Sequence, residues 1–348
     1  MRALARSLPG FAAAVPHVEL GTWPTPLEQV PLAGRPVWVK REGASDPIYG
    51  GNKIRTLEVW FGHARARGAK KIWSIGAYGS NHVIATLLHA ERAGLEVGAI
   101  LFPQPTSPWA VENCGAIIDA QCELVRLRSV IEVPFVGLAI ARREKHAVVM
   151  PPGGATTVGT MGALAAAFEL AEQIDAGLAP PPARIVLAIG STCTTAGLLA
   201  GLQLAHACGA WRWSVPIVHG VRVTPWPVTS RVRIANLARV TLARVAELGG
   251  PRVAIGMREL LDRLVVDGAE LGKGYGRSTP RSEAAVRALR GVRLDGVYSA
   301  KAAAALMRLH REGVGPLLFW ATKSEAVLGS PTLESLQAAP RAILDWLR

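Results

Sequence analysis

A lysine in a glycine-led turn is the first feature of the chain that could do chemistry. Only eight of the 39 lysines and arginines are lysines, and Lys53 follows Tyr49-Gly50-Gly51-Asn52 between two apolar segments. Adjacent glycines let the backbone approach a ligand closely, and the asparagine can hold a turn or cap the next helix. Because an enclosed pocket disfavours the ammonium form, such a lysine can attack a carbonyl and form a Schiff base. The local residues alone equally describe the start of a helix with a surface lysine.

A phosphate-binding loop is predicted where the apolar strand 184–189 ends. The sequence there, which opens a helix and carries four hydroxyl groups, is Gly190-Ser191-Thr192-Cys193-Thr194-Thr195-Ala196-Gly197. The free N–H groups at the start of a helix lie at the positive end of its dipole and attract a phosphate monoester. An ordinary capped helix start is the alternative that this pattern leaves open.

The elements that must position these turns alternate between strand and helix. Apolar runs predict strands at 36–40, 72–76, 97–102, 123–127, 147–150, 184–189, 214–221 and 317–321. Helices are expected at 54–68, 82–90, 110–120, 133–145, 161–176, 195–208, 230–248, 282–289 and from 332. Apart from the strand 36–40, the first 48 residues are expected to be proline-rich loops. Continuous apolar strands that alternate with helices indicate a parallel sheet covered on both faces, so the fold class is α/β.

Composition points to a globular protein of the reducing cytoplasm. The 348 residues are 50% hydrophobic with a mean hydropathy of +0.25, and no apolar run approaches the roughly 18 residues of a membrane span. We therefore expect neither a membrane anchor nor a signal peptide. The four cysteines, Cys114, Cys122, Cys193 and Cys208, have neither the spacing of zinc ligands nor that of a disulfide framework. We therefore expect neither a metal site nor disulfides.

The net charge of +13 raises nucleic-acid binding as a competing class of function. The arginines are spread singly along the chain, densest between Arg212 and Arg263, which favours a solvated basic face that steers anionic substrates. We expect no nucleic-acid partner, although a basic binding protein without catalysis stays an alternative. The glycine patterns of dinucleotide-binding and P-loop proteins do not occur.

Several motifs together resemble a known family. They are Gly-Gly-Asn-Lys-x-Arg-x-Leu-Glu from Gly50, Ser80-Asn81-His82, the loop 190–197, and the segment 295–301 with the sequence Asp-Gly-Val-Tyr-Ser-Ala-Lys. This set resembles the D-cysteine desulfhydrase and 1-aminocyclopropane-1-carboxylate deaminase group of pyridoxal-phosphate enzymes, whose fold is tryptophan-synthase-β-like. The resemblance implies two lobes, the smaller formed by 54–150 and the larger by 1–53 and 151–348. It also implies pyridoxal 5'-phosphate as cofactor, a small amino-acid substrate and a homodimer.

The same resemblance implies roles for single residues. Lys53 would hold the cofactor as a Schiff base and, once displaced by the substrate amine, act as a base at the substrate α- or β-carbon. Asn81 would bind the 3-hydroxyl of the cofactor, and Ser80 would lie near the substrate carboxylate or transfer a proton. The active-site tyrosines would be Tyr275 and Tyr298. The remaining cofactor-binding residues would be Asn52, the loop residues Gly190, Ser191, Thr192, Cys193, Thr194 and Thr195, and Thr322 facing the pyridine nitrogen.

Departures from the family pattern concern the substrate side. Ser299 stands where the deaminases have a glutamate, Lys323 where the family has a glycine, and 277–280 replaces a Pro-Asn-rich turn. A neutral hydroxyl at Thr322 would leave the pyridine nitrogen unprotonated and make it a weaker electron sink, which favours rapid loss of a β-group. We therefore predict β-elimination of a D-cysteine-like substrate to pyruvate and ammonia. Deamination of 1-aminocyclopropane-1-carboxylate, or another amino-acid substrate on the same scaffold, is the alternative.

Overall fold

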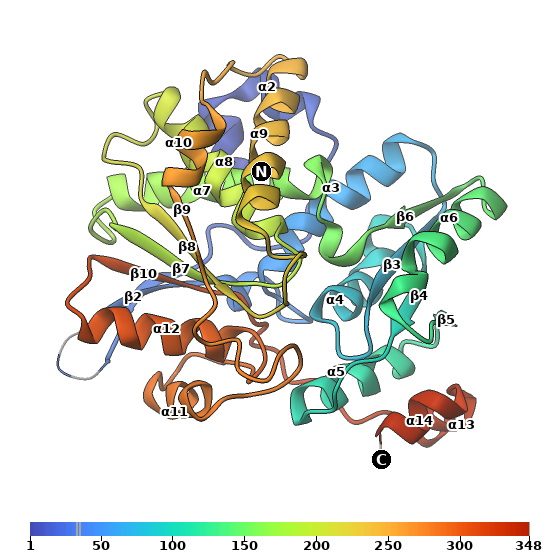
Figure 1. Cartoon of the computed structure of the whole chain (residues 1–348). Helices are drawn as coiled ribbons and strands as arrows, with labels where there is room; N and C mark the ends of the chain where they lie inside the picture. The colour runs from blue at the N-terminus through green and yellow to red at the C-terminus, as the bar shows by residue number, and fades with distance from the viewer. Residues whose placement is uncertain (33, 35, 348) are drawn as a thin grey trace.

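Two separate β-sheets form the framework of the computed structural model, which describes residues 1–32, 34 and 36–347 (Figure 1). The larger sheet has the strand order β1-β2-β10-β7-β8-β9, and the smaller sheet has the order β5-β4-β3-β6. Neighbouring strands run parallel, except that β1 pairs antiparallel with β2 at the edge of the larger sheet. The expected α/β fold with two parallel-sheet lobes is confirmed.

The larger sheet is covered by helices on both faces. Its strands are β1 Leu27–Val30, β2 Val37–Arg41, β7 Arg184–Ile189, β8 Ile217–Arg222, β9 Leu264–Asp267 and β10 Leu317–Ala321. Side chains alternate across the continuous apolar run of β10. Leu318 and Trp320 belong to the core shared with α7 (Thr157–Asp175), α8 (Cys193–Ala207), α9 (Arg231–Glu247) and α10 (Met257–Asp262). Phe319 and Ala321 pack in the core of the opposite face with α11 (Pro280–Ala288) and α12 (Ser299–Arg311).

The smaller sheet is layered in the same way. Its strands are β3 Lys71–Ala77, β4 Glu96–Phe102, β5 Glu123–Arg126 and β6 Ala147–Met150. One face packs with α3 (Asn52–Ala66), α4 (Asn81–Ala90) and α5 (Pro108–Asp119), and the other packs against α6 (Val133–Arg143). Short 3₁₀ turns occur at Glu42–Ser45, Glu91–Ala93, Val130–Glu132 and Pro152–Gly154.

The first 48 residues contain more regular structure than the sequence predicts. Two short helices, α1 (Arg2–Ser7) and α2 (Pro9–Ala14), precede β1 and bury Leu4 and Phe11 in the core of the larger lobe. Pro9 starts α2, because the first helical turn needs no N–H donor at that position. The sequence also failed to predict β9, α10 and α12.

The end of the chain returns to the smaller lobe. The single helix expected from residue 332 is two helices, α13 (Leu333–Ala338) and α14 (Arg341–Leu347), which lie near α5 in Figure 1. Ile343 is buried in the core of the smaller lobe, and the Trp346 ring packs edge-on against Tyr78 at 5.2 Å between centroids. The chain thus passes between the sheets after β2, after β6 and after β10. The exact domain limits stay a prediction.

Among the described residues, no helix combines the length and apolarity that crossing a membrane requires.

Candidate active site

A cavity of about 610 Å³ is lined by residues of both lobes. Every site residue that the sequence singled out lies in its wall: Asn52, Lys53, Ser80, Asn81, Gly190, Ser191, Thr192, Cys193, Thr194, Thr195, Tyr275, Tyr298 and Thr322. The structure therefore brings together segments that are up to 270 residues apart in the chain, and their individual roles stay predictions.

The lysine turn is built by a close approach of two backbones. Gly51 has φ of +107°, and a Cβ at this position would lie 2.8 Å from the carbonyl oxygen of Thr322. The Asn52 N–H donates to the same oxygen at 3.3 Å, and the Asn52 side chain donates to the Thr194 hydroxyl at 2.7 Å. Lys53 is consequently fixed between the end of β10 and the loop 190–195. Burial lowers the pKa of Lys53, which favours the neutral, nucleophilic amine.

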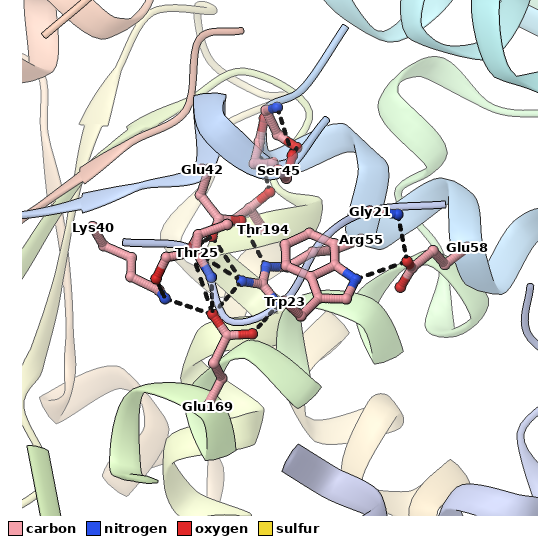
Figure 2. Close-up of polar contacts among 12 residues, drawn as sticks. Gly21, Trp23, Thr25, Lys40, Glu42, Ser45, Arg55, Glu58, Glu169 and Thr194 are labelled. Atoms are coloured by element: carbon pink, nitrogen blue, oxygen red, sulfur yellow. Dashed lines mark hydrogen bonds and ion pairs between the residues drawn. The ribbon is translucent and has the colours of Figure 1, made fainter. Parts of the chain in front are cut away.

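A buried network of ion pairs holds Arg55, which follows the lysine turn in α3 (Figure 2). The Arg55 Nε donates to Glu42 at 2.7 Å, and its two terminal nitrogens donate to the Glu169 carboxylate at 3.1 and 2.8 Å. The guanidinium also lies over the Trp23 ring, 3.8 Å from the centroid. Lys40 binds Glu169 from the other side, so two cations and two carboxylates balance. Burial alone would raise the pKa of Glu169, but Arg55 and Lys40 outweigh it and lower the pKa to about 2.

The loop 190–195 has the geometry of an anion cradle. Thr192, at φ +77°, precedes the first turn of the 15-residue helix α8, and its buried hydroxyl lacks a hydrogen-bond partner among the described residues. The first N–H groups of such a helix have no acceptor within the helix. Gly153 adopts φ +66° directly opposite, where a Cβ would lie 2.1 Å from the Ser191 Oγ. The Cys193 thiol turns toward the Gly154 carbonyl instead, and burial raises its pKa. These features fit a phosphate monoester.

The Ser80-Asn81-His82 turn combines a helix cap with polar groups that face the cavity. The Ser80 hydroxyl accepts the N–H groups of His82 and Val83 at 3.3 Å each, so Ser80 caps α4. The Asn81 Oδ1 accepts from the Tyr49 hydroxyl at 2.7 Å. Both ring nitrogens of His82 are buried without a partner among the described residues, and burial lowers its pKa well below the usual value. The neutral His82 ring is a cavity residue to which the sequence assigned no role.

Two tyrosines form a hydrogen-bonded pair at the cavity wall. The hydroxyls of Tyr275 and Tyr298 bind each other, and the rings meet edge-on at 5.9 Å. Gly190 makes room for this pair, because a Cβ there would lie 2.9 Å from the Tyr298 ring. Burial raises the pKa of Tyr275 to about 12 and that of Tyr298 well above the usual value. Both hydroxyls are therefore protonated near neutral pH. Ser299 turns away to bond Asp295 at 2.9 Å.

The electrostatic character of the cavity favours anionic ligands. Neither Asp nor Glu occurs among the described residues that line it, whereas four basic residues do: Lys53, Arg128, Arg233 and Lys323. The sequence offered no signal for Arg128 and Arg233, because both are single arginines in an arginine-rich chain.

The geometry agrees with the comparisons to known proteins. The family model described as pyridoxal-phosphate dependent enzyme matches residues 18–316. The chain belongs to this family. The protein is therefore an enzyme that uses pyridoxal phosphate as its cofactor. The resemblance seen in the motifs is confirmed.

Relatives cover nearly the whole chain. The nocardicin C-9' epimerase of Nocardia uniformis subsp. tsuyamanensis is 36% identical over 91% of this chain and 95% of its own length. The D-cysteine desulfhydrase of Salmonella paratyphi C (strain RKS4594) is 30% identical over 87% of this chain and 92% of its own. A crystal structure of an ACC deaminase homologue superposes with a TM-score of 0.73 at 27% identity, covering 92% of this chain and 96% of that one.

Proposed function

We propose that this pyridoxal-phosphate-dependent enzyme is a lyase that eliminates a β-substituent from a small amino acid and releases pyruvate and ammonia. The observation that carries the proposal is that Lys53 shares one cavity, free of acidic side chains in its described lining, with the protonated pair Tyr275 and Tyr298. A base of lowered pKa and neutral hydroxyl donors are the groups that such an elimination requires. The relative named D-cysteine desulfhydrase supports the same class of reaction.

The residues that would hold the cofactor lie at two ends of the site. Lys53 would bind its aldehyde carbon, and the loop 190–195 would bind its phosphate through backbone N–H groups and the unpartnered hydroxyl of Thr192. Asn81 would bind its 3-hydroxyl, and Thr322 would face the ring nitrogen with a neutral hydroxyl. When bound, pyridoxal phosphate supplies an electron-withdrawing ring that stabilises negative charge at the substrate α-carbon.

The protein side chains would then handle protons and the leaving group. The Lys53 amine removes the α-proton, for which its lowered pKa suits it. In the pair of Tyr275 and Tyr298 one hydroxyl donates to the other, and the second hydroxyl proton donates to the departing group or to the substrate carboxylate. The Ser80 hydroxyl, which already accepts two N–H groups, can still donate one hydrogen bond. Ser299 occupies the position of the deaminase glutamate, but its hydroxyl is bonded to Asp295 and would not take over the role of that glutamate. Ring opening of 1-aminocyclopropane-1-carboxylate is therefore disfavoured.

Epimerisation at the α-carbon is the second candidate. The relative named nocardicin C-9' epimerase is 36% identical over 328 residues, and the two reactions begin with the same proton removal. They differ in the next event, because an epimerase returns a proton to the opposite face whereas a lyase expels the β-group. The amino-acid unit would in that case belong to a substrate in a specialised pathway.

The proposal extends to the setting of the enzyme. We propose a homodimer in the cytoplasm that binds neither nucleic acid nor membrane, since the arginines are dispersed and the cavity accounts for anion binding. Light scattering of the purified protein measures the mass directly. A monomer would contradict the dimer.

Turnover in deuterium oxide separates the candidate reactions. The protein is incubated with D- and L-cysteine, β-chloroalanine and 1-aminocyclopropane-1-carboxylate while pyruvate, 2-oxobutyrate and sulfide are measured. We expect pyruvate from the β-substituted alanines and sulfide from cysteine. D- and L-alanine, which carry no β-leaving group, are incubated in the same way. Interconversion of the two enantiomers with deuterium at the α-carbon, without pyruvate from any β-substituted alanine, would replace the lyase with the epimerase.

Reduction with borohydride tests the cofactor site separately. Mass spectrometry of the reduced protein should find the pyridoxyl group on the peptide that contains Lys53, and Lys53→Ala should lose it while keeping some affinity through the phosphate loop. A pyridoxyl group on Lys273, Lys301 or Lys323 would refute the assignment.

A further inference from the structure

Lys323 is a buried lysine in the wall of the cavity. Its side chain is 4% exposed, and its Nζ lies 3.0 Å from Asn81 Oδ1, 3.3 Å from the Tyr49 hydroxyl and 3.4 Å from Asn113 Oδ1. The Nζ is also 5.5 Å from the centroid of the Tyr49 ring. The lysine follows Thr322 at the end of β10 and reaches across to α4 and α5 of the smaller lobe.

These contacts determine which way the Asn81 amide points. A lysine ammonium can only donate hydrogen bonds, so the Asn81 atom that faces it must be the oxygen. The same oxygen accepts from the Tyr49 hydroxyl at 2.7 Å and from the Asn113 amide at 3.0 Å. With its oxygen surrounded by three donors, Asn81 presents its NH₂ group to other partners, and Asn81 lines the cavity.

The charge of Lys323 has no carboxylate at ion-pair distance among the described residues. The charged groups that act on it from neighbouring elements are Asp295, Glu112 and Arg293, and Glu112 is itself paired with Arg293 at 2.7 Å. Burial lowers the pKa of Lys323, so holding its charge there costs free energy. A buried cation without a carboxylate partner is a candidate for stabilising a bound anionic group.

We propose that Lys323 is a positioning residue for the cofactor: it holds Asn81 with its amide N–H groups toward the cavity, and its positive charge stabilises negative charge on the cofactor oxygen that Asn81 binds. This inference rests on the cofactor placement proposed above. The ammonium is directed toward the polar cluster of Tyr49, Asn81 and Asn113.

The test is a pH titration of the visible absorbance of the cofactor-loaded protein. Removing a nearby positive charge raises the pKa of a proton on a bound group, so Lys323→Met should move the midpoint upward by about one pH unit or more. Lys323→Arg, which keeps the charge, should titrate near the unmutated protein. Tyr49→Phe removes a neutral donor to the same Asn81 oxygen and should move the midpoint less. A midpoint unchanged in Lys323→Met, or moved equally by Tyr49→Phe, would overturn the inference.

Thermal unfolding of the cofactor-free proteins separates positioning from a structural role. Lys323→Met should unfold at the same or a higher temperature than the unmutated protein, whereas Lys40→Met, which removes a buried lysine from its ion pair with Glu169, should lose stability. A loss of stability in Lys323→Met as large as that in Lys40→Met would contradict us. If the unmutated protein lacked a cofactor link at Lys53, the proposed cofactor site would fail first; a normal link with an unmoved midpoint would sink only the role of Lys323.

Discussion

Arg55 and Glu169 are 114 residues apart in the chain, yet each terminal nitrogen of the guanidinium donates to a different oxygen of the carboxylate. Arg55 and Lys53 lie in the first turn of α3, and Glu169 lies within α7. The pair therefore ties the catalytic lysine proposed here to the larger lobe.

Arg55→Met should destabilise the protein strongly. It leaves Glu42 and Glu169 buried with an unbalanced negative charge, and breaking a buried pair in this way costs about 3–5 kcal/mol. Urea unfolding measures the loss. The matched control is Arg244→Met, which removes an exposed pair with Glu247 and should cost about 1 kcal/mol or less. Equal losses in the two variants would show that the network is not what holds α3.

Acid should unfold the protein partly through Glu169. Its pKa of about 2 lies below the ordinary 4.5, so its stabilising contribution is complete above about pH 5 and is lost as the pH falls toward 2. The contribution is about 3 kcal/mol, because each pKa unit corresponds to roughly 1.4 kcal/mol.

Unfolding free energies at pH 6 and pH 3 measure this contribution. Glu169→Gln should be less stable than the unmutated protein at pH 6 and should lose less stability on acidification. Parallel losses in both proteins would assign acid unfolding to other carboxylates.

Gly153→Ala should weaken cofactor binding. A Cβ there would lie 2.1 Å from the Oγ and 2.3 Å from the Cβ of Ser191, and 3.5 Å from the Lys53 Nζ, so the proposed phosphate loop must move. We expect at least about a tenfold loss of affinity, equivalent to about 1.4 kcal/mol, in equilibrium dialysis.

Gly177→Ala is the control for backbone strain. Gly177 has φ +75°, but its Cβ would meet nothing within 4 Å. Both variants should lose stability, since alanine is strained at positive φ, but only Gly153→Ala should also lose cofactor affinity. Equal cofactor affinities would show that the space beside Ser191 does not matter.

Tyr298→Phe should slow turnover by roughly a hundredfold while the cofactor still binds, because it removes a protonated hydroxyl from the cavity. Tyr78→Phe changes a buried tyrosine that packs on Trp346 and should leave turnover unchanged. Steady-state kinetics of both variants decide the matter. An unaltered rate in Tyr298→Phe would confine the tyrosine pair to a packing role.

Most elements near the site could be predicted because their signals are local. The strand predicted at 72–76 lies within β3, and the helix predicted at 54–68 corresponds to α3, which begins and ends two residues earlier. The helices α1 and α2 were missed because six residues are too few to show a helical period. Their stability comes from burying Leu4 and Phe11 in a core formed by distant segments.

The wall of the cavity was predicted where a motif marked it and missed where it depends on tertiary contacts. The loop 190–195 is recognisable in the sequence by its hydroxyl residues and by its position after a strand. The position of the Lys323 ammonium could not be foreseen, because it depends on Tyr49, Asn81 and Asn113, which come from separate elements. The buried ion pair of Lys40 and Glu169 likewise could not be predicted, because it forms only when β2 packs against α7.

The return of the chain to the smaller lobe after β10 limits how the two lobes can hinge. A rotation that widened the cavity would have to bend three connections at once, and the third contains Lys323, whose ammonium donates hydrogen bonds to residues of α4 and α5. Opening the cleft would draw that ammonium away from Asn81. If Lys323 positions Asn81 as we propose, the angle between the lobes and the affinity of the site for its cofactor are coupled through this lysine.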